Sequence, residues 1–268
     1  MRFSEQLFEI IKQYASQKEL SWIENKANGS LQTLQTAFVA TPRFVSKNII
    51  NSAETINDVN INDWTLDRLV RVYLLTTLDS SDKAIYTKTL DTLFETAENN
   101  EAVALISALP FFAYPDYWVL RATDAVRSNI GLVFDAIAFQ NPYPMRHLSE
   151  LAWNQLVLKC IFNDKPIHRI QGLNERANQE LANSISYLAH ERWAAGRTIP
   201  SQAWRLVSKF MNDAIFKDIC TLFVSQNSND NIAAALVCRE TDFAAAKEEQ
   251  KKQIELDKQT HSWQMLEV

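Results

Sequence analysis

Apolar residues recur along most of the chain with the period of an α-helix. In the segment 63–78 they lie at i, i+3, i+4, i+7 and i+8 and form one stripe: Leu66, Leu69, Val70, Tyr73 and Leu74. No segment alternates between apolar and polar residues as a half-buried strand would. The same periodicity predicts further helices at 4–26, 30–40, 82–97, 100–113, 116–139, 146–162, 178–195, 201–211, 213–225, 230–240 and 242–260.

The composition supports a helical fold, because the 268 residues include only 4 Gly and 7 Pro while 47% are hydrophobic. The glycines are far apart, which excludes a P-loop and a Rossmann fingerprint. Successive helices with short connectors bury their stripes against neighbours. We therefore expect an all-α protein, an αα-solenoid with a HEAT-like right-handed helical superhelix. Residues 1–241 are predicted to form a single elongated domain, and 242–268 a charged C-terminal helix or tail.

Charge and cysteine usage narrow the class of protein. The net charge is −5 and basic residues are interleaved with acids, so we expect no nucleic-acid partner. Cys160, Cys220 and Cys238 fit neither a disulfide framework nor paired zinc ligands. Glu5 and Glu9 interrupt what would be the apolar region of a signal peptide. The longest uncharged stretch, 27–42, is too short to span a bilayer. These features predict a cytoplasmic protein without a membrane span.

Polar residues gather inside strongly apolar helices between Arg121 and Arg197. In the predicted helix 146–162, His147, Glu150 and Asn154 share one face. In the next long helix, Asn183, Tyr187 and His190 share another, so two apolar helices could enclose one polar seam. The connector between them carries arginines that could grip a carboxylate or phosphate. The sequence therefore predicts a ligand site in this region, centred on the two helices and their connector.

The strings RSNIGLVFDAIAFQNPYP, HLSELAWNQLVLKCIF, PIHRIQGLNERANQELA and YLAHERWAAGR resemble the EboA family over roughly 110–210. The resemblance implies a non-catalytic protein that assists traffic or handling of a biosynthetic metabolite precursor towards the cell envelope. It implies as partners a small-molecule metabolite, a membrane prenyltransferase-like protein and other proteins of the same operon. No catalytic residue and no cofactor are expected. The residues predicted to bind the ligand are Arg127, Asn129, His147, Glu150, Asn154, His168, Arg169, Arg176, Tyr187, His190 and Glu191.

Three alternatives remain open at this point. The first is a metal-dependent hydrolase or isomerase using His147, Glu150 and His190, although HxxE spacing is weak evidence for a metal site. In the second, the aromatic run 111–118 either walls a pocket or packs a helix junction. The third concerns the arginines of the region, which either receive anions or pair with Asp124, Asp135 and Glu175.

Overall fold

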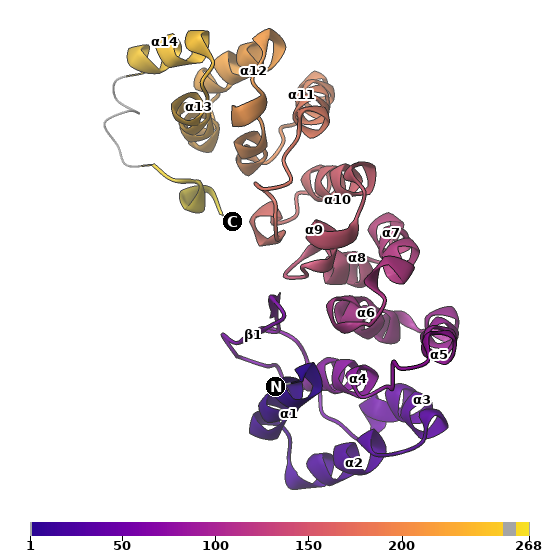
Figure 1. Cartoon of the computed structure of the whole chain (residues 1–268). Coiled ribbons are helices and arrows are strands. Elements are labelled where there is room, and N and C mark those ends of the chain that lie inside the picture. Colours follow the sequence, from indigo (N-terminus) through magenta and orange to yellow (C-terminus); the bar gives the residue numbers. More distant parts are fainter. Residues whose placement is uncertain (1, 254–260, 268) are drawn as a thin grey trace. The chain divides into compact units, whose positions relative to one another are not determined.

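The computed structural model describes residues 2–253 and 261–267, and helices make up most of this part of the chain (Figure 1). The chain divides into two compact units, Met1–Ser149 and Glu150–Val268. The first unit contains α1 (Phe3–Tyr14), α2 (Gln17–Ala27), α3 (Leu31–Ala40), α4 (Leu66–Thr76), α5 (Lys83–Thr96), α6 (Asn99–Ala108), α7 (Val119–Arg127), α8 (Gly131–Ala138) and α9 (Tyr143–His147), with 3-10 turns η1 (Thr41–Arg43), η2 (Leu109–Phe111) and η3 (Pro115–Trp118).

The second unit begins with α10 (Glu150–Phe162), and the connectors that join α10 to α11 and α11 to α12 contain 3-10 turns. The fold of the described residues is thus all-α, as predicted, with one small hairpin. The HEAT-like right-handed superhelix stays a prediction, and so does the division into 1–241 and 242–268. The other elements are η4 (Ile167–Arg169), α11 (Gln179–Ala194), η5 (Ser201–Leu206), η6 (Ser208–Phe210), α12 (Asp213–Phe223), α13 (Ser228–Glu240), α14 (Ala244–Lys252) and η7 (Trp263–Leu266).

Helix α4 lies at the centre of the first unit. It packs against α1, α3 and α6, and α6 packs in turn against α8, so α4, α6 and α8 form one row in Figure 1. All residues of α4 are buried except Arg68 and Thr76. Most residues of this helix are apolar, and of its charged residues Asp67 and Arg71 are buried, with Arg71 Nη2 3.6 Å from Glu101 Oε1.

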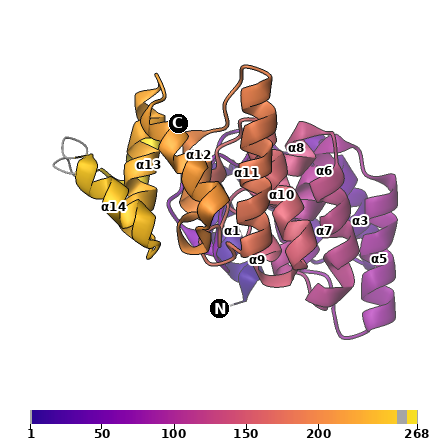
Figure 2. The same ribbon diagram turned by 90° about the horizontal axis from the view of Figure 1, so that it is seen from above.

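Helix α13 has the corresponding position in the second unit, where α12, α14, η5 and η7 all contact it. Helices α10 and α11 pack side by side, and α11 also contacts α12 (Figure 2). Side-chain caps define where the helices of this unit begin. Asn178, Asn212 and Asn227 each accept a hydrogen bond from a backbone N–H in the first turn of α11, α12 and α13, respectively.

Several predicted helices are interrupted in the structure. The segment 4–26 forms two helices because Ser16 makes a capping box with Glu19 and starts α2. The segment 116–139 forms η3, α7 and α8, separated where Ser128 leaves the helical conformation and its hydroxyl accepts a hydrogen bond from the N–H of Ile130. The segment 201–211 forms the 3-10 turns η5 and η6 instead of an α-helix. Within 242–260 the structure gives α14, and 254–260 lie outside the described residues.

The predicted helix 146–162 is wrong at its start. His147 ends the short helix α9, Leu148 is extended with ψ of 144°, and the following helix begins at Glu150. His147, Glu150 and Asn154 are therefore not residues of one helix, and the shared face predicted for them does not exist. The proline-rich start at 142–144 explains α9, since proline favours the first turn of a helix.

A hairpin that the apolar pattern missed joins β1 (Thr55–Ile56) to β2 (Val59–Asn60). Its two-residue turn, Asn57 and Asp58, has φ of 50° and 64°, which is typical of a type I′ turn. Ile56 and Val59 pair across the hairpin and are both buried. The strands are too short to show alternation, so only the turn residues could have indicated them.

Candidate functional site

The connector between α10 and α11 begins with a tight turn that ends α10 and reverses the direction of the chain. Asp164 adopts φ of 51°, and the N–H of Lys165 donates to the carbonyl of Cys160 at 2.9 Å, as in a Schellman motif. Pro166 follows, which prevents the helix from continuing. Ile167 and Ile170 are buried and hold the 3-10 turn η4 against the second unit, which leaves the side chain of His168 between them partly exposed.

This connector forms one wall of a cavity of about 320 Å³ in the second unit. Such a volume is at the lower end of the range found for small-molecule sites. Segment 198–202 forms a second wall of the cavity. Residues at the start of α13 and in η7 line the rest of the cavity. The lining residues are Asp164, Lys165, Pro166, Ile167, His168, Thr198, Ile199, Pro200, Ser201, Gln202, Asn227, Asn229 and Leu266.

Some polar side chains of this cavity already have partners inside the protein. Ser201 Oγ donates to Oδ1 of the buried Asp230 at 2.5 Å, and Gln202 Nε2 donates to the Trp263 carbonyl at 2.9 Å. The side chains of His168, Thr198 and Asn229, by contrast, hydrogen-bond to no residue of the described chain. An imidazole, a hydroxyl and an amide therefore remain available to a small molecule in the cavity.

Of the residues predicted to bind a ligand, His168 is the one that lines this cavity. Arg169 is half-buried in η4, where its backbone N–H donates to the Pro166 carbonyl. Sequence reasoning missed Thr198 and Asn229. The Asn-rich run at 226–231 was a signal for the second of these, because consecutive Asn and Asp residues favour a capped helix start with polar groups around it.

Asn154 has a structural role on α10. Its amide pairs reciprocally with that of Asn178, with Nδ2 to Oδ1 distances of 3.1 and 2.9 Å, and Asn178 is also the N-cap of α11. Nearby, the Arg176 guanidinium stacks on Trp153 at 4.8 Å, and burial lowers the pKa of Arg176 while the Glu150 carboxylate opposes that shift. Glu150 itself is exposed. These contacts fix the junction of the two helices.

The polar face of α11 packs against α12, not against α10 as the sequence suggested. Asp218 is buried on α12 and accepts hydrogen bonds from Ser186 Oγ at 2.5 Å and from His190 Nε2 at 2.6 Å. The side chain of His190 is 52% exposed. Ser186 and His190 both contact this carboxylate, and no hydrogen bond links the two side chains, so the serine–histidine–aspartate order of a nucleophile–base relay is not formed. Tyr187 and Glu191 are exposed on the same helix.

The remaining candidates belong to the first unit. His147 lies with Nδ1 at 3.6 Å from Asp116 Oδ1, whereas Arg127 and Asn129 are exposed at the end of α7 and just after it. His190, which the metal-site hypothesis grouped with His147, pairs with Asp218 in the second unit. Among the residues described, no three His, Cys, Asp or Glu side chains are grouped to hold a metal ion.

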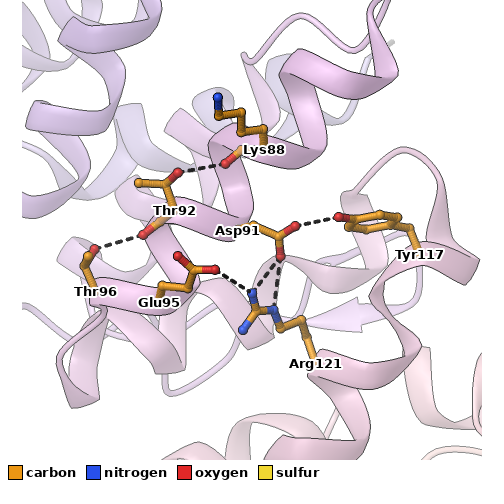
Figure 3. A network of polar contacts seen from close by, with 7 residues as sticks. All are labelled: Lys88, Asp91, Thr92, Glu95, Thr96, Tyr117 and Arg121. Carbon is orange, nitrogen blue, oxygen red and sulfur yellow. Dashed lines mark hydrogen bonds and ion pairs between the residues drawn. The ribbon is translucent and has the colours of Figure 1, made fainter.

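The aromatic run 111–118 packs a helix junction. Trp118 is fully buried, and its ring lies within 6.5 Å, centroid to centroid, of Tyr86, Phe94, Phe112 and Tyr117. Arg121 is committed to a neighbouring network, which Figure 3 shows. Its Nη2 lies 2.8 Å from Asp91 Oδ1 and 3.9 Å from Glu95 Oε1, and Asp91 also accepts from the Tyr117 hydroxyl. Asp91 and Glu95 thus replace the partners suggested by the sequence.

The described residues form an all-α fold with one small hairpin, and a small cavity with polar lining residues lies in the second unit. The chain belongs to the EboA family, described as metabolite traffic protein EboA, whose family model matches residues 3–208. Comparison with curated proteins and with solved structures finds no match. Within the described residues, none of the helices is both long enough and apolar enough to cross a membrane.

Proposed function

We propose that this protein assists metabolite traffic by binding a small biosynthetic precursor, without transforming it, in the cavity of the second unit. The observation that carries the proposal is a set of three side chains around one cavity that hydrogen-bond to no described residue: His168, Thr198 and Asn229. Unpaired polar groups are costly when they are desolvated, and a ligand that hydrogen-bonds to them removes that cost. Family membership supports a role in metabolite traffic.

The lining indicates the chemistry of the ligand. Hydroxyl, amide and imidazole groups both donate and accept hydrogen bonds, so they suit a compact molecule with several hydroxyl or carbonyl groups. Lys165 adds a positive charge and Asp164 a negative one at the α10 end. We infer a small polar metabolite with hydrogen-bonding groups on more than one side. Delivery towards the cell envelope, through a membrane prenyltransferase-like protein and other proteins of the same operon, belongs to the same proposal.

Substitutions that leave the fold intact test this function. His168→Ala, Thr198→Val and Asn229→Ala each remove one group from the cavity and none of the hydrogen bonds described above. In cells that lack the endogenous protein, we expect each variant to restore much less of the pathway product than the wild type. Their melting temperatures should stay within about 2 °C of the wild type, because side chains that contact no partner contribute little to stability.

His147→Ala is the matched control, since this histidine is also partly exposed and lies outside the cavity. It should restore wild-type amounts of product. If the folded cavity variants restore full product, the cavity is not the working site. If His147→Ala alone loses activity, the site lies in the first unit.

A further inference from the structure

Arg68 is an exception on α4, whose other residues are buried apart from Thr76. Its neighbours in α4 are buried on both sides, yet Arg68 retains partial exposure. The position is also unfavourable for a cation, because Arg68 lies in the first turn of the helix, where the macrodipole is positive. Neither apolar packing nor helix electrostatics explains an arginine here.

The guanidinium of Arg68 is held in one orientation by two contacts. It stacks over the ring of Trp64 with 4.0 Å between Cζ and the ring centroid, and Nε donates to Ser107 Oγ at 3.0 Å. Ser107 is buried on α6 and donates its own proton to the Val103 carbonyl. Trp64 is buried as well. Trp64 and Ser107, which are both buried, therefore fix the plane of the Arg68 guanidinium.

The outer edge of Arg68 remains unused. Nη1 and Nη2 make no hydrogen bond to any described residue, and neither is among the polar atoms sealed from solvent without a partner. The two nitrogens are therefore in contact with solvent and free to donate hydrogen bonds. This is the half of a guanidinium that binds carboxylates and phosphates through two parallel hydrogen bonds.

No acid of the described chain forms an ion pair with Arg68. Burial lowers the pKa of Arg68 to about 9, and no carboxylate opposes the shift. On the same helix, Arg71 lies 3.6 Å from Glu101 Oε1, and that carboxylate raises its pKa against the effect of burial. Arg121 in Figure 3 is satisfied by two acids. Arg68 thus carries a partly desolvated charge that no acid among the described residues neutralises.

We propose that Arg68 is the receptor for the oxyanion group, carboxylate or phosphate, of a small ligand bound to the first unit. Trp64 and Ser107 act as positioning residues that hold the guanidinium plane. An oxyanion bound to Nη1 and Nη2 of Arg68 neutralises the guanidinium charge and accepts a hydrogen bond from each of the two nitrogens. This inference does not rest on the function proposed for the cavity, because none of the three residues lines it.

Arginine side-chain NMR of the full chain provides a direct test. The Nε–H signal of Arg68, assigned by its absence in Arg68→Lys, is followed while inorganic phosphate or acetate is added at constant ionic strength. We expect a saturable shift, and the more effective anion identifies phosphate or carboxylate as the group recognised. Ser107→Ala should weaken binding about tenfold or more if it orients the guanidinium. A linear or absent response to both anions overturns the proposal.

Arg121→Gln is the matched control, because Arg121 also stacks on an aromatic ring, with 5.2 Å between Cζ and the Phe94 centroid. It should leave the Arg68 titration unchanged. Thermal melting tests whether the Arg68 side chain stabilises or destabilises the fold. In chloride, Arg68→Met should melt at or above the wild-type temperature, since it removes an unpaired charge. In phosphate, the wild type should gain more than the variant. If Arg68→Met lowers the melting temperature equally in both salts, Arg68 is a structural residue and the proposal fails.

Discussion

Glu19 shows how one side chain can bring a loop and a helix together. Its carboxylate accepts hydrogen bonds from the backbone N–H and hydroxyl of Ser16, at 2.7 and 2.6 Å, and from the N–H of Ser46 at 2.7 Å. Burial alone would raise the pKa of Glu19, but the hydrogen bonds from Ser16 and Ser46 outweigh it and hold the pKa at about 2, below the usual 4.5.

A lowered pKa means that Glu19 stabilises the fold while it is ionised. This contribution is complete above the unfolded-state value of 4.5 and is lost as the pH falls towards about 2. We expect Glu19→Gln to cost about 1 kcal/mol near neutral pH, after allowance for solvent screening, and almost nothing near the acid end. Urea unfolding at several pH values measures the difference. The exposed Glu9→Gln is the control, and a cost independent of pH would contradict the argument.

Individual site residues could be predicted only where they depend on local sequence. His168 lies in a connector between two apolar helices, and the sequence placed it correctly in a loop; the structure puts it at a cavity. The partner of His190 could not be predicted, because Asp218 is 28 residues away and pairing depends on how α11 rotates against α12. Asn154 looked like a ligand group, but a helix cap from another segment pairs with it.

At the scale of elements, the hairpin turn gives a prediction that depends on backbone conformation. Asp58 has φ of 64°, a region that a β-branched residue avoids. Asp58→Val should destabilise the protein by about 1–2 kcal/mol. Asp58→Gly should be nearly neutral, because relief of that strain offsets the loss of an exposed ion pair with Arg146. Chemical denaturation measures both, with the exposed Thr55→Val as control. If Asp58→Val and Asp58→Gly lower the free energy of unfolding equally, the ion pair with Arg146 contributes more than the backbone conformation at Asp58.

The helical periodicity predicted where helices lie but not where they are interrupted. The breaks at Ser16, Ser128 and Leu148 are not visible in the apolar pattern, because the helix that follows each break again buries apolar residues. A capping box such as that of Ser16 and Glu19 is visible in sequence. The extended Leu148 has no such signal, so the shared face of His147 and Asn154 was inferred from a helix that does not exist.

At the scale of the whole molecule, the first unit contains its own core. Helix α4 packs on α1, α3 and α6, and α6 on α8, all within Met1–Ser149. A unit whose buried helices find their partners within it should fold without the rest of the chain. We therefore expect a fragment of residues 1–149 to be helical by circular dichroism and to unfold cooperatively on heating.

A shorter fragment, 1–128, is the matched control, because it ends after α7 and lacks α8. Phe134 and Ile137 of α8 are almost completely buried, and α8 covers one side of α6. Removing both side chains should cost roughly several kcal/mol, enough to abolish or greatly lower the cooperative transition of a unit this size. If 1–149 also lacks a cooperative transition, the first unit depends on the second for its fold. If both fragments melt alike, α8 is not part of the core that holds α6.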